Sequence, residues 1–177
     1  MGGASPDAMR AIVVMGVTGC GKTSVAMALA ERIDARMLEG DAFHPAQNIQ
    51  KMKDGIPLTD ADRQGWLESL GHELAQASAA GEFAVLSCSA LKRRYRDTLR
   101  ASSPGLGFVF LQLSRSAAME RVAHRNGHFM PASLVDSQFR DLEPPIDEPA
   151  VLTLDATESL PVIVDRIVAC WRLPRAG

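Results

Sequence analysis

A glycine-rich segment near the start of the chain has the residue types and spacing of a phosphate-binding loop. Residues 16–23 read GVTGCGKT and match the pattern G-x-x-x-x-G-K-[ST]. Glycines let backbone N–H groups approach phosphate closely, the lysine can reach the β- and γ-phosphates of ATP, and the last hydroxyl can take a Mg²⁺ position. The predicted ATP-binding residues are Gly16, Val17, Thr18, Gly19, Cys20, Gly21, Lys22, Thr23 and Ser24.

Three residues of this loop receive more specific predictions. Lys22 is the predicted catalytic cation, and Thr23 is a predicted Mg²⁺ ligand. Cys20 is interpreted as a small tolerated side chain, in preference to a redox-sensitive thiol near ATP.

Two carboxylates follow the second predicted strand. Glu39 and Asp41 would lie at the carboxyl end of that strand, where open parallel sheets bind their ligands. Such a pair can orient Mg²⁺-bound water and accept the proton of an attacking hydroxyl. We assign the water-mediated metal contact to Glu39 and the catalytic proton acceptance to Asp41, with a solvated turn as the alternative. Asp155, after the last predicted strand, fits either a Mg²⁺-assisting acid or a helix cap.

Basic residues gather at the same predicted edge of the sheet. Arg63 follows an acidic segment, while Lys92 and Arg96 are spaced to share one face of a helix after the third strand. An anionic substrate such as a sugar acid would explain this cluster, and we include all three residues in the predicted substrate site. The ordinary alternative for each single residue is a solvated surface charge.

Arg121 and Arg125 are also spaced for one helical face, immediately before Asn-Gly-His. They predict the entry to a lid, residues 125–142, that brings arginine to the transferring phosphate. Both would contact ATP, and Arg125 is a predicted catalytic residue. The alternative is that these cations only stabilise the end of their own helix through its dipole.

Strand-like and helix-like segments alternate along the chain, which predicts an α/β fold with a mostly parallel sheet and helices on both faces. The predicted strands cover residues 11–15, 37–38, 83–86, 108–113 and 151–154. The predicted helices cover residues 22–33, 46–53, 60–80, 91–101, 116–125, 132–142 and 160–171, the third capped by Asp60. We expect one domain, residues 1–177, whose first nine residues are flexible.

The composition narrows the classes of partner. The chain has 177 residues, 46% hydrophobic and 23% charged, which is typical of a globular domain. A formal net charge of −2 gives no broad attraction for nucleic acid or an anionic membrane. Three widely spaced cysteines favour a reducing compartment over a disulfide framework. We therefore expect a cytoplasmic protein that acts on a small molecule and binds neither nucleic acid nor membrane.

Four longer segments make the prediction more specific. They read GVTGCGKT, EGDAFHPAQNIQKMKDGIPLTDADRQGWL, SCSALKRRYRDTLR and RNGHFMPASLVDSQFRDLEPP. Together they resemble the small P-loop type of ATP-dependent gluconokinase over nearly the whole chain. The resemblance implies a three-layer, nucleoside-monophosphate-kinase-like fold with sheet order 2-3-1-4-5, a lid and commonly a homodimer. It also implies transfer of the γ-phosphoryl group of ATP to D-gluconate, with Mg²⁺, giving 6-phospho-D-gluconate and ADP.

The resemblance also implies roles for single residues. Carried over by motif, Asp41, His44, Arg63 and Lys92 lie where the sugar acid should bind. Glu39 stands where the family is expected to have aspartate, and the longer acid can still hold a metal-bound water.

Two alternatives of different class stay open. A shikimate-type kinase would share the fold and an acid after the second strand, but SCSAL replaces the glycine triplet that such kinases carry after the third strand. A nucleotide-binding regulatory module without catalysis is the second alternative. The intact Lys22, Thr23, Asp41 and Arg125 argue against it.

Overall fold

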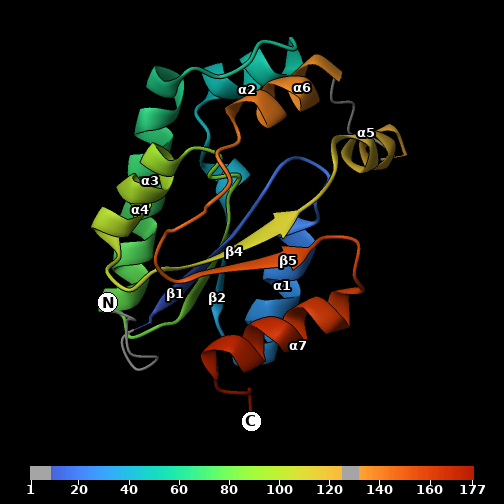
Figure 1. The fold of residues 1–177 in the computed structure, drawn as a ribbon. Coiled ribbons are helices and arrows are strands. Elements are labelled where there is room, and N and C mark those ends of the chain that lie inside the picture. The colour runs from blue at the N-terminus through green and yellow to red at the C-terminus, as the bar shows by residue number, and fades with distance from the viewer. Residues whose placement is uncertain (1–8, 125–131) are drawn as a thin grey trace.

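The computed structural model describes residues 9–124 and 132–177, and Figure 1 shows how they are arranged. The strands are β1 (Ala11–Met15), β2 (Arg36–Glu39), β3 (Ala84–Ser87), β4 (Gly107–Gln112) and β5 (Val151–Asp155). The helices are α1 (Lys22–Ile33), α2 (Ala46–Lys53), α3 (Asp60–Ala79), α4 (Arg93–Ser102), α5 (Arg115–Ala123), α6 (Ala132–Asp141) and α7 (Leu160–Trp171). A short 3-10 helix, η2 (Gly40–Phe43), follows β2.

The strands form one parallel sheet in the order β2-β3-β1-β4-β5. The predicted α/β class and strand order are therefore confirmed. The helices α1, α2 and α7 have the bounds predicted from the sequence. In α1 and α7 a clear apolar period marks the buried face, whereas the start of α2 is marked by Pro45. The described part of the chain contains no helix long and apolar enough to cross a membrane.

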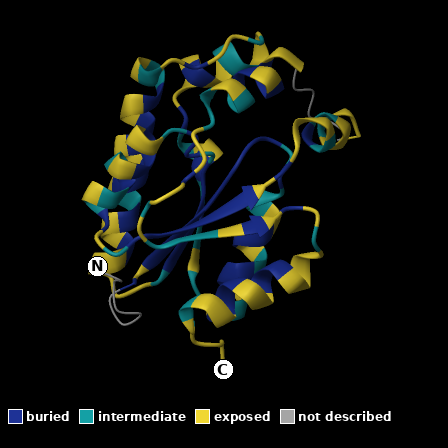
Figure 2. Ribbon diagram, in the orientation of Figure 1, coloured by how far each residue is buried: buried dark blue, intermediate teal, exposed yellow. Residues whose placement is uncertain are grey.

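Two apolar cores lie on opposite faces of the sheet. Along β1, Ile12 and Val14 join the core that includes α1 and α7, whereas Val13 and Met15 join the core that includes α3 and α4. This division follows from the alternation of side chains along a strand. Figure 2 shows the buried central strands and the exposed outer faces of the helices. The sheet is thus the buried middle layer of three, and the loops that follow its strands are positioned at its edge.

Thr59, rather than Asp60, caps α3. The Thr59 hydroxyl accepts a hydrogen bond from the Asp62 N–H, and the Asp62 carboxylate accepts one from the Thr59 N–H. This reciprocal pair is a capping box. The prediction that Asp60 is the cap was therefore wrong by one residue, and Asp60 is left to contact side chains from α4.

The carboxyl ends of β1, β2 and β3 meet at one edge of the sheet, beneath α2 and α6 in Figure 1. Gly40 is required at this edge because a Cβ there would lie 2.4 Å from the Ser87 carbonyl oxygen. Without a side chain, η2 can turn directly beside the end of β3. This close approach brings Asp41 to the same edge as the phosphate loop.

Candidate active site

The phosphate loop joins β1 to α1 through a backbone that glycine adopts easily. Gly19 and Gly21 have φ angles of 83° and 93°, in the left-handed region. The Gly16 N–H donates a hydrogen bond of 3.3 Å to the Ser89 carbonyl, which ties the loop to the segment after β3. Because α1 begins directly after Gly21, the positive end of its dipole faces the loop. The loop therefore has the geometry of an anion cradle.

Lys22 and Thr23 are the first two residues of α1, directly after the phosphate loop glycines. Lys22 Nζ donates to the Val17 carbonyl at 3.2 Å and lines the neighbouring cavity. Thr23 Oγ1 donates to Glu39 Oε2 at 2.7 Å and lies 3.4 Å from Ser87 Oγ. Hydroxyl and carboxylate oxygens suit Mg²⁺ when water and substrate phosphates complete its coordination. Thr23 and Glu39 therefore fit the predicted metal position.

A cavity beside the loop brings together residues from distant parts of the chain. Its wall contains Thr18, Lys22, Asp41, His44, Met52, Pro57, Leu58, Arg63, Trp66, Ser89, Leu134, Ser137 and Gln138. Three of the predicted substrate-binding residues, Asp41, His44 and Arg63, are among them. The Asp41 side chain is 80% exposed, so its carboxylate is accessible to a ligand.

His44 forms a flat, fixed part of this wall. Its ring stacks on Trp66 with centroids 4.1 Å apart, and Trp66 Nε1 donates to the Gly40 carbonyl at 2.8 Å. Burial lowers the pKa of His44, Asp41 acts in the opposite direction, and Arg63 adds to the lowering. The imidazole is therefore neutral at pH 7, with Nε2 located 3.9 Å from Asp41 Oδ1.

Arg63 is a second cation of the cavity wall, besides Lys22. Its Nη1 donates to the Tyr95 hydroxyl at 2.9 Å and to Asp141 Oδ2 at 3.3 Å. The guanidinium carbon also lies 5.3 Å from the centre of the Tyr95 ring. Nε and Nη2 have no hydrogen bond to any residue that the structure describes. A largely buried arginine with donors still available is suited to binding a carboxylate.

Lys92 is not part of the cavity wall in the described ranges. Its Nζ donates to Asp60 Oδ1 at 3.0 Å, and Asp60 also accepts hydrogen bonds from Arg94 and from the Tyr95 hydroxyl. The hydrogen bonds from Tyr95 and then Lys92 lower the pKa of Asp60 to about 2. Lys92 is thus paired next to the wall that contains Arg63, and its contact with a substrate stays a prediction.

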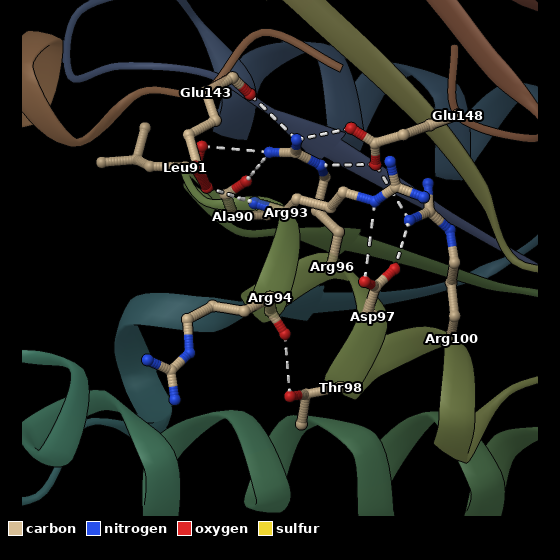
Figure 3. Close-up of polar contacts among 10 residues, drawn as sticks. All are labelled: Ala90, Leu91, Arg93, Arg94, Arg96, Asp97, Thr98, Arg100, Glu143 and Glu148. Carbon is tan, nitrogen blue, oxygen red and sulfur yellow. Dashed lines mark hydrogen bonds and ion pairs between the residues drawn. The ribbon is translucent and has the colours of Figure 1, made fainter. Parts of the chain in front are cut away.

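Arg96 is fully buried, and the prediction that it binds the substrate is wrong. Its guanidinium donates to both carboxylate oxygens of Glu148, at 2.9 and 2.6 Å, and to the carbonyls of Ala90, Leu91 and Glu143. Figure 3 shows the guanidinium enclosed by these acceptors. All five N–H donors of the arginine are used. The residue therefore fastens α4 to the segment between α6 and β5.

Glu148 completes this buried cluster. Burial raises the pKa of Glu148, but the hydrogen bonds from Arg96 and Arg100 more than offset that effect, so the pKa lies below its ordinary value. Arg100 Nη1 reaches Glu148 Oε1 at 2.9 Å. The carboxylate is consequently ionised at neutral pH and pairs with both Arg96 and Arg100.

Helix α6 lies within the predicted lid, and α5 precedes it in the chain. Arg121 donates to the Gly19 carbonyl at 3.1 Å and to the Ala156 carbonyl at 3.0 Å, so it fastens α5 to the phosphate loop. Arg125 lies outside the described residues. In α6, Gln138 Oε1 accepts a hydrogen bond of 2.6 Å from the Thr18 N–H. One helix thus contacts both the phosphate loop, through Gln138, and Arg63, through its final residue.

Four residues of the site were not singled out from the sequence: Trp66 and Gln138 in the cavity wall, and Tyr95 and Asp141, which contact Arg63. The segments that carry the resemblance contain all four, which was the available signal. Their partners lie far away along the chain, as Thr18 and Gln138 do with a separation of 120 residues. A pattern of neighbouring residues cannot indicate a partner that lies so far away along the chain.

The contacts also bear on two interpretations left open by the sequence. Asp155 Oδ1 accepts hydrogen bonds from the N–H and hydroxyl of Thr157 at 2.8 and 2.7 Å. This arrangement favours a turn-stabilising role before α7 over a Mg²⁺-assisting role. Cys20 is buried in the core on the α1 side of the sheet, which agrees with its interpretation as a small packed side chain.

Fold and loop together define the class of protein. A G-x-x-x-x-G-K-[ST] loop between a buried strand and a helix of a parallel sheet, with a hydroxyl and a carboxylate beside it, is the arrangement of P-loop proteins that bind nucleoside triphosphates. Consistently, residues 12–145 match the protein family described as AAA domain.

Comparison with known proteins narrows this class. The chain is 45% identical over 159 residues to the gluconokinase of Gluconobacter oxydans strain 621H, covering 90% of this chain and 89% of that one. It is 39% identical over 153 residues to the thermoresistant gluconokinase of Escherichia coli strain K12, covering 86% and 87%. The crystal structure of a gluconokinase from Sinorhizobium meliloti 1021 aligns with a TM-score of 0.83 at 50% identity, covering 92% and 91%. The chain belongs to the gluconokinase family.

Proposed function

We propose that this protein phosphorylates D-gluconate with ATP, giving 6-phospho-D-gluconate and ADP. One cavity carries the proposal, because its wall holds Lys22 of the phosphate loop, the accessible carboxylate of Asp41 and the buried Arg63. A sugar-acid kinase needs a cation for the transferring phosphate, a base for the attacking hydroxyl and a positive partner for the substrate carboxylate. Family membership selects gluconate among the sugar acids.

In the proposed reaction the ATP phosphates lie along the loop backbone, with Lys22 at the β- and γ-oxygens. Asp41 accepts the proton of the substrate hydroxyl while the hydroxyl oxygen forms a bond to the γ-phosphorus. The bond to the β–γ bridging oxygen breaks, and ADP leaves with that electron pair. Thr23 directly, and Glu39 through water, would hold Mg²⁺, which supplies positive charge for the phosphate oxygens when bound. Arg63 orients the sugar acid through its carboxylate.

The lid, the homodimer and the cytoplasmic location remain predictions. The position of α6 supports a lid over residues 125–142, because this helix contacts both the phosphate loop and Arg63. Closure of such a lid would exclude water from the transferring phosphate. Arg121 and Arg125 would then contact ATP from the lid arm.

The test of the proposal is ADP release measured with gluconate, glucose, shikimate, AMP or no acceptor. We expect rapid turnover with gluconate alone. Glucose shares most hydroxyls with gluconate but lacks the acid, so equal turnover with glucose would remove the carboxylate argument. Preference for shikimate would favour the alternative kinase, and no turnover with any acceptor would favour a regulatory module. Lys22→Ala is the negative control and should abolish turnover in a folded protein, because the loop is held by backbone contacts.

A further inference from the structure

Asn48, on the inner face of α2, is a completely buried polar residue next to the cavity. Its Nδ2 donates a hydrogen bond of 2.9 Å to the Asp62 carbonyl and lies 3.3 Å from His44 Nδ1. Its Oδ1 is buried and has no partner among the described residues. A buried carbonyl oxygen without a partner is unfavourable, so some other requirement must hold the amide in this orientation.

The Asp62 carbonyl explains which way the amide faces. A backbone carbonyl only accepts hydrogen bonds, so the Asn48 atom beside it must be the nitrogen. That nitrogen carries a second hydrogen, and His44 Nδ1 is the acceptor within reach. A ring nitrogen that accepts a hydrogen bond carries no proton, so in the neutral ring the proton resides on Nε2.

The ring plane and the ring tautomer thus have separate causes. Stacking on Trp66 fixes the plane of the His44 ring but is indifferent to which nitrogen carries the proton. The hydrogen bond from Asn48 to Nδ1 determines that Nε2 carries the proton. The Nε2–H then points to the side of the ring where Asp41 Oδ1 lies at 3.9 Å, close enough for a small adjustment of the exposed Asp41 side chain to complete a hydrogen bond.

We propose that Asn48 is a positioning residue that fixes His44 in the Nε2–H tautomer, so that His44 presents a neutral hydrogen-bond donor to the Asp41 carboxylate. In this role the donor orients the Asp41 carboxylate while leaving its charge available for the substrate proton. The inference rests on the proposed function for its catalytic meaning, whereas the tautomer itself is independent of which acceptor is phosphorylated. The alternative is a purely structural role, in which Asn48 only fastens α2 to α3 through the Asp62 carbonyl.

The primary experiment is ¹⁵N NMR of protein labelled at histidine, with the His44 signals assigned by His44→Gln. We expect a protonated Nε2 and an unprotonated Nδ1 for His44 at neutral pH. A protonated Nδ1 in the wild-type protein would overturn the proposal without the need for any variant. Equal populations of the two tautomers would overturn it as well.

Asn48→Leu removes the donor at similar volume. We expect mixed tautomers of His44 and a kcat lower by about two- to tenfold, the usual effect of one neutral hydrogen bond, with the KM for ATP unchanged. The matched control is Gln76→Leu, because Gln76 Nε2 lies 3.0 Å from Nε2 of the exposed His72, and this variant should leave both His44 and kcat unchanged. If Asn48→Leu lowers stability but leaves the His44 tautomer and kcat unchanged, Asn48 has only the structural role. A wild-type Nε2–H tautomer without gluconate phosphorylation would instead refute only the proposed function.

Discussion

Arg63 and Arg96 occupy two neighbouring regions of the molecule, and both are buried arginines paired with a carboxylate. Arg96 lies in the cluster between α4 and Glu148, where all five of its donors are used. Arg63 lies in the cavity wall, where the described contacts use only Nη1. Burial and ion pairing are thus shared by both arginines. The donors that remain available distinguish a residue that can bind a ligand from one that fastens the fold.

The largest effect should come from the fully paired cluster. Glu148→Ala leaves the buried Arg96 without its carboxylate partner, and removal of one partner from a buried ion pair costs about 3–5 kcal/mol of stability. Urea unfolding should show this loss, while the KM for gluconate of the folded protein should be unchanged. An exposed ion pair contributes roughly 1 kcal/mol or less. If the unfolding free energy of Glu148→Ala lies within about 1 kcal/mol of the wild type, the interpretation that Arg96 fastens the fold is contradicted.

The second effect concerns the cavity wall. Arg63→Met should raise the KM for gluconate by about ten- to a hundredfold, since a charge-assisted hydrogen bond contributes about 1.5–3 kcal/mol, and should leave the KM for ATP nearly unchanged. Arg94→Met is the matched control, because Arg94 also pairs with a carboxylate in this region but its side chain is 64% exposed. Steady-state kinetics with each substrate varied in turn decides the matter. Equal increases in both KM values would show that Arg63 shapes the whole site instead.

Lys92 is an intermediate case that sharpens the comparison. Its pair with Asp60 is partly exposed, and such pairs contribute at most about 1 kcal/mol. The charge of Lys92 is already paired outside the described cavity wall. Lys92→Met should therefore raise the KM for gluconate by less than about fivefold. An increase as large as that for Arg63→Met would mean that Lys92 leaves Asp60 and binds the substrate, as the family resemblance implies.

The smallest effect is a dependence on pH. Because the folded pKa of Asp60 is lowered to about 2, its contribution to stability is present above the ordinary pKa of 3.8 and is lost as the pH falls toward 2. Asp60→Asn should therefore be less stable than the wild type at pH 7, and the two unfolding free energies should converge between about pH 4 and pH 2. Chemical unfolding across this range measures the convergence. Parallel curves would show that Asp60 is not held by Tyr95 and Lys92 in solution.

Local patterns in the sequence were sufficient for the elements and the phosphate loop. Hydrophobic period and stop signals placed β1, α1 and α7 correctly, and the G-x-x-x-x-G-K-[ST] pattern located the anion cradle between the first two of these. Both kinds of signal are contained within a few neighbouring residues. Glu39 was likewise placed at the carboxyl end of the second strand, and it is the last residue of β2, where its carboxylate accepts a hydrogen bond from Thr23.

Only the tertiary structure decided which polar residues serve the cavity. Arg96 was predicted to bind substrate because it follows the third strand in a cluster of cations. Its partner Glu148 lies 52 residues away, so no pattern near Arg96 indicates the pairing. The roles of Asn48 beside His44 and of Gln138 beside Thr18 depend in the same way on the packing of α2 and α6 against the sheet edge. Residue type and spacing determine where charges lie along the chain. Whether a charge stays available for a ligand depends on which acceptors the folded chain places around it.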